Sequence, residues 1–154
     1  MKKMFLFLAV VMMAMSSCNR EDEQNYTSQE GIYGTVVERY GNWMPVIGNA
    51  PDHGERPISI GVYVYEYTKL SDFDQAYYGA YPMDVMPKPL VASTISNADG
   101  SYEVALSPGK YSVFLLENGK LYATYSDEYG GLMPVTVDTN TRVQFDLVLD
   151  HACY

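Results

Sequence analysis

The fold of this chain is decided by TISNADGSYEVALSPGKYSV, which occupies residues 94–113. Two runs within it alternate apolar residues with polar or small ones, and turn residues precede each run: Asn97–Gly100 before the first and Ser107–Gly109 before the second. Because successive side chains of a strand point to opposite faces, the runs predict two strands joined by a tight turn. Gly100 is the residue that can take a positive φ in the first turn.

Short alternating runs of the same kind recur along the chain, separated by Gly, Pro, Asn and Asp. No long stretch shows the 3.6-residue period of a helix, so the runs indicate strands. The predicted strands are Gly31–Arg39, Pro57–Tyr67, Leu90–Ser96, Ser101–Leu106, Lys110–Glu117, Lys120–Tyr125 and Thr141–Asp150. Together they predict an all-β domain over residues 31–150, a single seven-stranded antiparallel β-sandwich. The residues expected in its core are Ile60, Val62, Val64, Tyr102, Val104, Leu106, Tyr111, Val113, Leu115, Val143, Phe145, Leu147 and Leu149.

Two stretches resemble a known family. GIYGTVV, residues 31–37, is similar to the I-x-G-x-V opening strand of carboxypeptidase regulatory-like domains, and residues 94–113 resemble their D-G-x-Y and P-G-x-Y hairpin. The resemblance spans about Gly31 to Leu149 and implies a transthyretin-like (prealbumin-like) Greek-key sandwich. It also implies an accessory module without peptidase activity of its own. The chain departs from the pattern in its long Tyr40–Arg56 connection, where the family often has a short turn.

The N-terminus has the layout of an export signal. Lys2 and Lys3 precede an apolar run of twelve residues, Met4–Met15, and the small residues Ser16–Ser17 follow. A helix of that length rises about 18 Å, which is short of the roughly 30 Å hydrocarbon core of a bilayer. Residues 1–17 are therefore predicted to be a cleaved signal peptide rather than a membrane span.

The residue after those serines is a cysteine. MSSC, residues 15–18, resembles the bacterial lipobox, although Met15 stands where leucine is usual. The resemblance implies cleavage before Cys18 and attachment of acyl chains such as palmitate to it, which would hold the protein on a membrane. Cys153 is the only other cysteine, so no intrachain disulfide is expected.

Residues 18–30 are polar and acidic and are predicted to be a flexible tether. An acidic run after a lipidated cysteine looks like the signal that sends some outer-membrane lipoproteins to the cell surface; the alternative is a plain solvated spacer. Loss of Lys2 and Lys3 with the signal leaves eight basic and nineteen acidic residues, a side-chain charge of −11 (8 − 19). That negative charge argues against nucleic acid as a partner. At the other end of the chain, residues 151–154 are expected to be a C-terminal tail.

Residues suited to catalysis are sparse. The only histidines are His53 and His151, and His151 with Cys153 offers two metal ligands where zinc needs at least three. The acidic pairs at 72/74 and 127/128 do not resemble a calcium loop. We therefore expect no enzyme activity, no catalytic residue, no metal and no cofactor, while a hydrolase or metal enzyme built on the acidic loops stays as a weaker alternative.

A row of tyrosines offers a binding surface instead. Tyr63, Tyr65 and Tyr67 alternate with residues expected in the core, so they share the opposite face of their strand. If that face is exposed, it suits a protein partner or a surface polysaccharide; if the long Leu70–Pro89 connection covers it, it becomes a second small core. The residues expected to bind are Tyr63, Tyr65, Tyr67, Trp43, Tyr77 and Tyr78. The sequence thus predicts a non-enzymatic surface lipoprotein that serves as a binding or structural module, or alternatively as a glycan binder.

Overall fold

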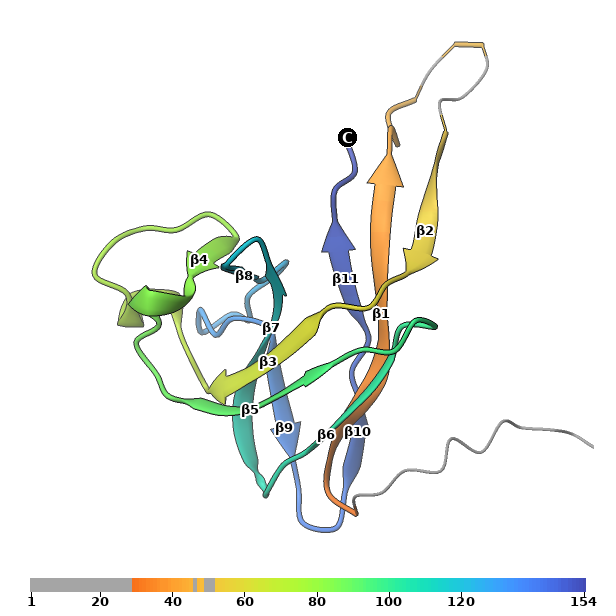
Figure 1. The fold of residues 1–154 in the computed structure, drawn as a ribbon. Coiled ribbons are helices and arrows are strands. Elements are labelled where there is room, and N and C mark those ends of the chain that lie inside the picture. The colour runs from red at the N-terminus through yellow and green to blue at the C-terminus, as the bar shows by residue number, and fades with distance from the viewer. Residues whose placement is uncertain (1–28, 46, 49–51) are drawn as a thin grey trace, which may run out of the picture.

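A computed structural model describes residues 29–45, 47–48 and 52–154. The signal peptide, Cys18 and the tether up to residue 28 lie outside the described residues. The described chain is all-β and forms two sheets in a sandwich-like arrangement, with two short 3-10 turns and no α-helix within those ranges (Figure 1).

Most elements are short, and many are joined by turns. The strands are β1 (Gly31–Gly41), β2 (His53–Pro57), β3 (Gly61–Glu66), β4 (Ala80–Pro82), β5 (Leu90–Ile95), β6 (Ser101–Ala105), β7 (Gly109–Glu117), β8 (Lys120–Tyr122), β9 (Pro134–Val137), β10 (Arg142–Gln144) and β11 (Leu147–Asp150). The 3-10 turns are η1 (Leu70–Asp72) and η2 (Met83–Val85).

The first sheet is built around β1, whose two halves have different neighbours. The first half lies between β10 and β6, and the second half lies between β11 and β2. β10 and β11 run parallel to β1, so the prediction of a purely antiparallel sandwich is wrong for this sheet. Parallel neighbours need a long crossover, which nearly the whole domain supplies between β1 and β10.

The second sheet is antiparallel throughout, in the order β4-β8-β7-β3-β5, with β9 on the first half of β7. β7 is the central strand, and β5 is at the edge. The turn at residues 97–100 forms, with the Gly100 amide bonded to the Asn97 carbonyl. The hairpin expected within residues 94–113 does not form, because β6 pairs with β1 in the first sheet whereas β5 and β7 belong to the second. Gly100 takes the expected positive φ, at 81°.

The predicted strand Thr141–Asp150 is divided into β10 and β11, and β2, β4 and β9 were not predicted. β2 lies mostly in the Tyr40–Arg56 connection, and it shares only Pro57 with the predicted strand Pro57–Tyr67, which is otherwise β3. Between β2 and β3 the chain leaves the ladder, and the Ser96 hydroxyl bonds to the carbonyl of Ile58 and the amide of Ile60. Between β10 and β11, Asp146 Oδ1 accepts from the amide of Thr35, at 2.8 Å. Side chains thus replace ladder hydrogen bonds at both breaks. The described residues form eleven strands, more than the seven predicted.

The residues that carry the family resemblance meet at the second of these breaks. Gly34 faces the backbone of Phe145, and a Cβ on Gly34 would lie 2.5 Å from the Phe145 carbonyl oxygen. The Tyr102 hydroxyl donates to that same oxygen. A Cβ on Gly100 would lie 2.5 Å from the carbonyl oxygen of Val36, further along β1. Both glycines therefore allow close backbone approach, and the tyrosine satisfies an oxygen that has left the ladder.

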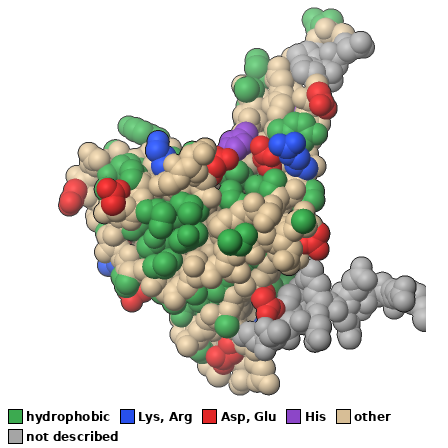
Figure 2. All heavy atoms as spheres, viewed as in Figure 1, with side chains coloured by type: hydrophobic (Ala, Val, Ile, Leu, Met, Phe, Trp, Pro, Cys, Tyr) green, Lys and Arg blue, Asp and Glu red, His purple; other side chains and the backbone are tan. Residues whose placement is uncertain are grey.

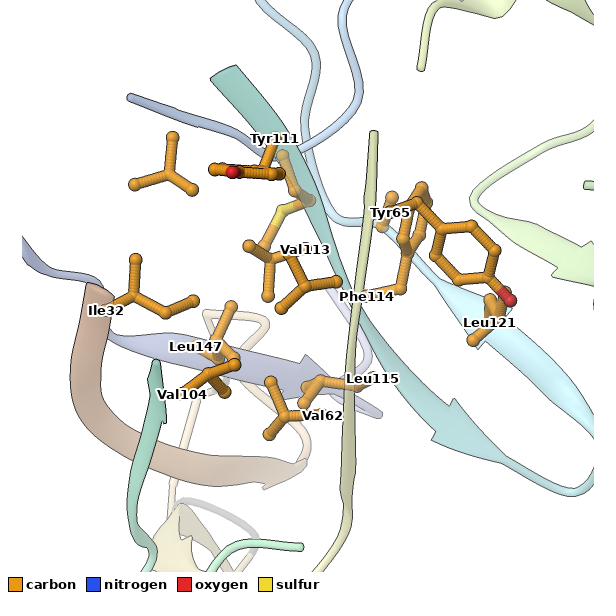
Figure 3. Close-up of a cluster of buried hydrophobic side chains, with 14 of the residues drawn as sticks. Ile32, Val62, Tyr65, Val104, Tyr111, Val113, Phe114, Leu115, Leu121 and Leu147 are labelled. Atoms are coloured by element: carbon orange, nitrogen blue, oxygen red, sulfur yellow. The ribbon is translucent and has the colours of Figure 1, made fainter. Parts of the chain in front are cut away.

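The core between the sheets confirms most of the predicted positions (Figure 3). The predicted residues that are buried are Val62, Val64, Tyr102, Val104, Leu106, Tyr111, Val113, Leu115, Leu147 and Leu149. Ile60, Val143 and Phe145 are only half-buried, because they flank the two breaks. Residues 151–154, predicted as a C-terminal tail, follow β11 beside β1: the amides of His151 and Cys153 donate to the carbonyls of Arg39 and Gly41.

Candidate functional site

The predicted tyrosine row is not an exposed surface. Tyr65 is buried and packs edge-to-face on Phe114, with ring centroids 5.7 Å apart, while Tyr63 and Tyr67 are half-buried. The covering group is Tyr81, itself buried, whose ring lies 6.1 Å from that of Phe114. The Leu70–Pro89 connection therefore covers part of this face, as one of the two alternatives expected, and the Tyr65 ring is not accessible to a ligand in this structure.

The covering connection has an aromatic stack of its own. Phe73, Tyr77 and Tyr81 form a triangle of rings with centroids 5.5, 5.0 and 5.7 Å apart. Tyr81 joins this triangle to Phe114 of β7, so contacts run without a break from the surface to the second core. Packed aromatic pairs add about 0.5–1.5 kcal/mol each beyond area burial. The connection is thus a packed structure, even though it contains little regular secondary structure.

Two open clefts flank the segment from Phe73 to Tyr77. The larger, of about 560 Å³, is lined by Leu70, Phe73, Asp74, Gln75, Ala76, Tyr77, Tyr78 and Tyr81. The second, of about 510 Å³, is lined by Phe73, Asp74, Gln75, Tyr77, Asp84, Val85 and Met86. We call them together the aromatic clefts. Their volumes fall in the range of small-ligand sites.

The aromatic clefts combine ring faces with uncharged and acidic polar groups. Asp74 and Asp84 supply carboxylates, and the Gln75 amide donates to the Tyr77 hydroxyl at 2.7 Å. Among the described residues, no Lys or Arg lines either cleft. Tyr78 stands almost fully exposed at the rim. The arrangement can stack a ligand ring and accept hydrogen bonds from its hydroxyl groups.

The residues expected to bind therefore separate into three places. Tyr77 and Tyr78 line the aromatic clefts, and Tyr63, Tyr65 and Tyr67 are covered or half-covered. Trp43 lies beyond the end of β1, where its ring packs edge-to-face on His53 with centroids 4.7 Å apart. The other residues that line the clefts were not predicted to bind, among them Phe73, Tyr81, Asp84 and Met86. The density of aromatic residues in a long connection was the one signal available for them.

Tyr67 takes part in a clamp that holds the turn at residues 127–131. Its hydroxyl donates to Asp127 Oδ2 at 2.9 Å, and Lys110 Nζ lies 3.8 Å from its ring centroid and 3.2 Å from Asp127 Oδ2. Partial desolvation raises the pKa of Asp127, but hydrogen bonds from the Gly131 amide, Tyr67, Lys110 and the Tyr129 amide outweigh it and bring that pKa to about 2. The Asp127 oxygens thus serve the fold.

His151 bridges the two sheets. Its Nδ1 lies 3.0 Å from Glu38 on β1, and its Nε2 lies 3.0 Å from Glu117 at the end of β7. Hydrogen bonding to Glu38 raises the pKa of His151, partial burial opposes the rise, and Glu117 adds to it. Figure 2 shows a histidine side chain with acidic side chains beside it on this face of the molecule. Within the part of the chain that the structure describes, no three His, Cys, Asp or Glu side chains are placed to hold a metal ion.

No family model, curated protein or solved structure matches the chain. Among the residues that the structure describes, none belong to a helix long and apolar enough to cross a bilayer.

Proposed function

We propose that this chain is a non-catalytic binding module, held on the outer membrane by lipid on Cys18, and that the aromatic clefts are its ligand site. The observation that carries the proposal is the continuous stack from Tyr77 through Tyr81 to Phe114. A ring that rests on the core loses little conformational freedom when a ligand stacks on it, so little of the binding energy is spent on ordering.

The ligand that suits the clefts best is a neutral carbohydrate. The C–H face of a sugar carries partial positive charge and packs on the negative face of an aromatic ring. The carboxylates of Asp74 and Asp84 and the amide of Gln75 suit sugar hydroxyls. Because acids line the clefts without a basic residue among the described ones, and the mature chain carries −11, anionic sugars are repelled.

A protein partner is the second candidate, and the observation that favours it is the β5 edge. β5 ends the second sheet and carries no charged residue, while Leu90, Val91 and Ile95 are exposed on it. An uncharged edge strand can accept a strand from another protein. Ile95→Lys is expected to remove this mode of binding and to leave carbohydrate binding unchanged, whereas Tyr77→Ala is expected to do the opposite.

We also propose that the fold is a transthyretin-like, carboxypeptidase regulatory-like sandwich. The proposal is supported by the positions of Gly34, Gly100 and Tyr102, the motif residues, which serve the close contacts of β1 with its neighbours. It implies an accessory role and no chemistry of its own.

The test of the ligand site is binding to immobilised neutral polysaccharides, with polyuronates and sulfated glycans alongside. We expect binding to a neutral polysaccharide and a loss of about 10-fold in affinity for Tyr77→Ala, which corresponds to about 1.4 kcal/mol. Tyr154→Ala is the matched control, because Tyr154 is an exposed tyrosine that bonds to Asp150 beside β1. Binding to no neutral glycan, or an equal loss in both variants, would overturn the proposal.

The anchor is tested separately. Metabolic labelling with palmitate is expected to mark the wild-type chain and not a Cys18→Ala variant, because the thiol is the acylation site. A label that persists in the variant contradicts the anchor, and leaves the ligand site to be judged on the binding assay.

A further inference from the structure

The second sheet ends in an edge strand that lacks the usual protection against pairing. β5 pairs with β3 on one side, and among the described strands none pairs with its other side (Figure 1). Its six residues include no charged residue and no proline. On this strand Ile95 is 71% exposed, Leu90 is 46% exposed and Val91 is 45% exposed.

Other edge strands of the molecule carry residues that discourage pairing. β2 contains Glu55 and Arg56, β4 contains Pro82, and β6 contains Glu103. Charged side chains and proline are the means by which sheet edges avoid unwanted partners. β5 is therefore an edge that is open to a further strand.

The ladder between β3 and β5 determines which backbone groups point outward. The Ser96 amide donates to the Ile60 carbonyl where this ladder begins. Bonded positions alternate along an antiparallel pair, so Thr94 also bonds to β3, whereas the amides and carbonyls of Ser93 and Ile95 point away from it. These outward groups are the ones to which an added strand would bond.

We propose that a second copy of this chain docks on the β5 edge, antiparallel to it, and forms a two-fold symmetric dimer with one continuous sheet. This names the partner for the protein-binding mode of β5 proposed above, and it rests on that mode. The register shift between Val64 and Tyr65 falls at Val91, so the regular pairing is limited to residues 91–95. The pairing that uses this whole segment is centred on Ser93, and it places Ile95 of each copy opposite Val91 of the other.

Charges at the two ends of β5 favour a second copy over an unrelated strand. Lys88 precedes the strand with a 39% exposed side chain and only a distant partner, Asp72 at 4.0 Å. Asp99 follows the strand and is exposed, and hydrogen bonds from Ser101 hold the pKa of Asp99 below its ordinary 3.8. About the Ser93 centre, Lys88 of one copy lies opposite residue 98 of the other, beside Asp99. Opposite charges therefore meet at both ends of the paired strands.

Docking at β5 leaves the aromatic clefts open. None of the residues that line the clefts belongs to β5. A two-fold axis perpendicular to the joined sheet also keeps the cleft-bearing faces of both copies on the same side. The dimer and the carbohydrate site can therefore be tested separately.

The test is analytical ultracentrifugation of a chain that begins at Asn19, which retains every described residue. A reductant is present so that the exposed Cys153 cannot crosslink two copies. We expect the mass to rise with concentration towards twice that of the monomer. Ile95→Lys is expected to raise the dissociation constant about 10-fold or more, since it places a charge on each paired edge. Tyr129→Lys, at a tyrosine outside β5 that is 69% exposed, is the matched control and is expected to leave the constant unchanged.

Two further measurements separate strand pairing from other kinds of dimer. Amide hydrogen exchange at Ser93 and Ile95 is expected to slow as the concentration rises, whereas exchange at Thr94, which already bonds to β3, is not. Lys88→Glu is expected to weaken the dimer about 5-fold at low salt. Lys120→Glu makes the same change in net charge on β8 and is expected to have little effect.

A monomer at every concentration overturns the proposal. So does a dimer that Ile95→Lys leaves intact, that Tyr129→Lys weakens equally, or that gives Ser93 no protection from exchange. Equal effects of Lys88→Glu and Lys120→Glu overturn it as well. Because the readouts are mass and amide exchange, none of these outcomes depends on carbohydrate binding.

Discussion

The His151 bridge makes a prediction about stability and pH. Its imidazole holds Glu38 of the first sheet and Glu117 of the second, each at 3.0 Å. The change to test is His151→Gln, which keeps a polar side chain and one hydrogen bond but cannot carry charge. Arg56 still pairs with Glu38 in the variant, at 2.7 Å, so that carboxylate keeps a cationic partner.

The direction of the pH dependence follows from the pKa shifts of His151 and Glu38. The pKa of His151 in the folded protein lies above its ordinary 6.5, so its contribution is fully present below pH 6.5 and is lost as the pH rises through the folded pKa. The pKa of Glu38 lies below its ordinary 4.5, because His151 and Arg56 donate to it. Its contribution is therefore present above pH 4.5 and is lost as the pH falls through the folded value. The bridge is strongest between about pH 5 and 6.5.

Exposure to solvent limits how much the His151 bridge stabilises the fold. The His151 side chain is 38% exposed, and those of Glu38 and Glu117 are 16% and 25% exposed. Exposed pairs contribute about 0.2–1 kcal/mol each, so we expect both together to stabilise the fold by about 1 kcal/mol at pH 5.5. For a domain of this size that corresponds to a Tm lower by about 3–6 °C in the variant. At pH 8.5, well above the ordinary pKa of histidine, less of the ring is protonated, and we expect the variant to lose less stability than at pH 5.5.

The measurement is urea denaturation and thermal unfolding of the wild type and the variant at pH 5.5 and 8.5, at low and high salt. His53→Gln is the control, since it changes the only other histidine of the chain. The reasoning is refuted if His151→Gln costs the same at both pH values, or if His53→Gln reproduces its pH dependence.

Three further predictions concern the contacts that hold the scaffold. Tyr102→Phe is expected to lower the free energy of unfolding by about 1–3 kcal/mol, because the Phe145 carbonyl loses its donor; an unchanged urea midpoint would contradict this role. Phe114→Ala is expected to cost about 3–5 kcal/mol by emptying the second core and to alter the near-ultraviolet circular dichroism of the tyrosines packed on it. A loss of unfolding free energy in Phe114→Ala no larger than that in Ile95→Ala would contradict this role of Phe114. The Asp127 carboxyl, with a pKa of about 2, is expected to remain ionised at pH 3 in carbon-13 NMR; titration near its ordinary 3.8 would disprove the clamp.

Local patterns predicted the parts of the fold that depend on local geometry. The alternation in residues 94–113 identified β6 and β7, and the turn chemistry identified Gly100, because strand period and turn conformation are properties of a few adjacent residues. The same alternation could not show that Phe114 is buried, because Tyr81, 33 positions earlier in the chain, covers its side of the sheet.

The pairing of strands far apart in the chain could not be predicted from the sequence, for a related reason. Nothing in Gly31–Gly41 indicates that β10 and β11 lie parallel to it, since direction is set by the path of the chain between them. The break at Asp146 is similar: its carboxylate takes the Thr35 amide, a contact between residues 111 positions apart. Tertiary contacts of this kind override a strand pattern that reads as continuous.

The separation between scaffold and site limits what a family resemblance can say about this chain. Gly34, Gly100 and Tyr102 all serve the close packing around β1, and none of them lines the aromatic clefts. The clefts are instead built from the Leu70–Pro89 connection, which a sandwich can vary in sequence and length. Tyr81 is where the two meet, because it packs on Phe114 below and on Tyr77 above. Changes at the exposed rim, such as Tyr78, should therefore alter the ligand and leave stability nearly unchanged, whereas changes within the packed rings, such as Tyr81, should alter both.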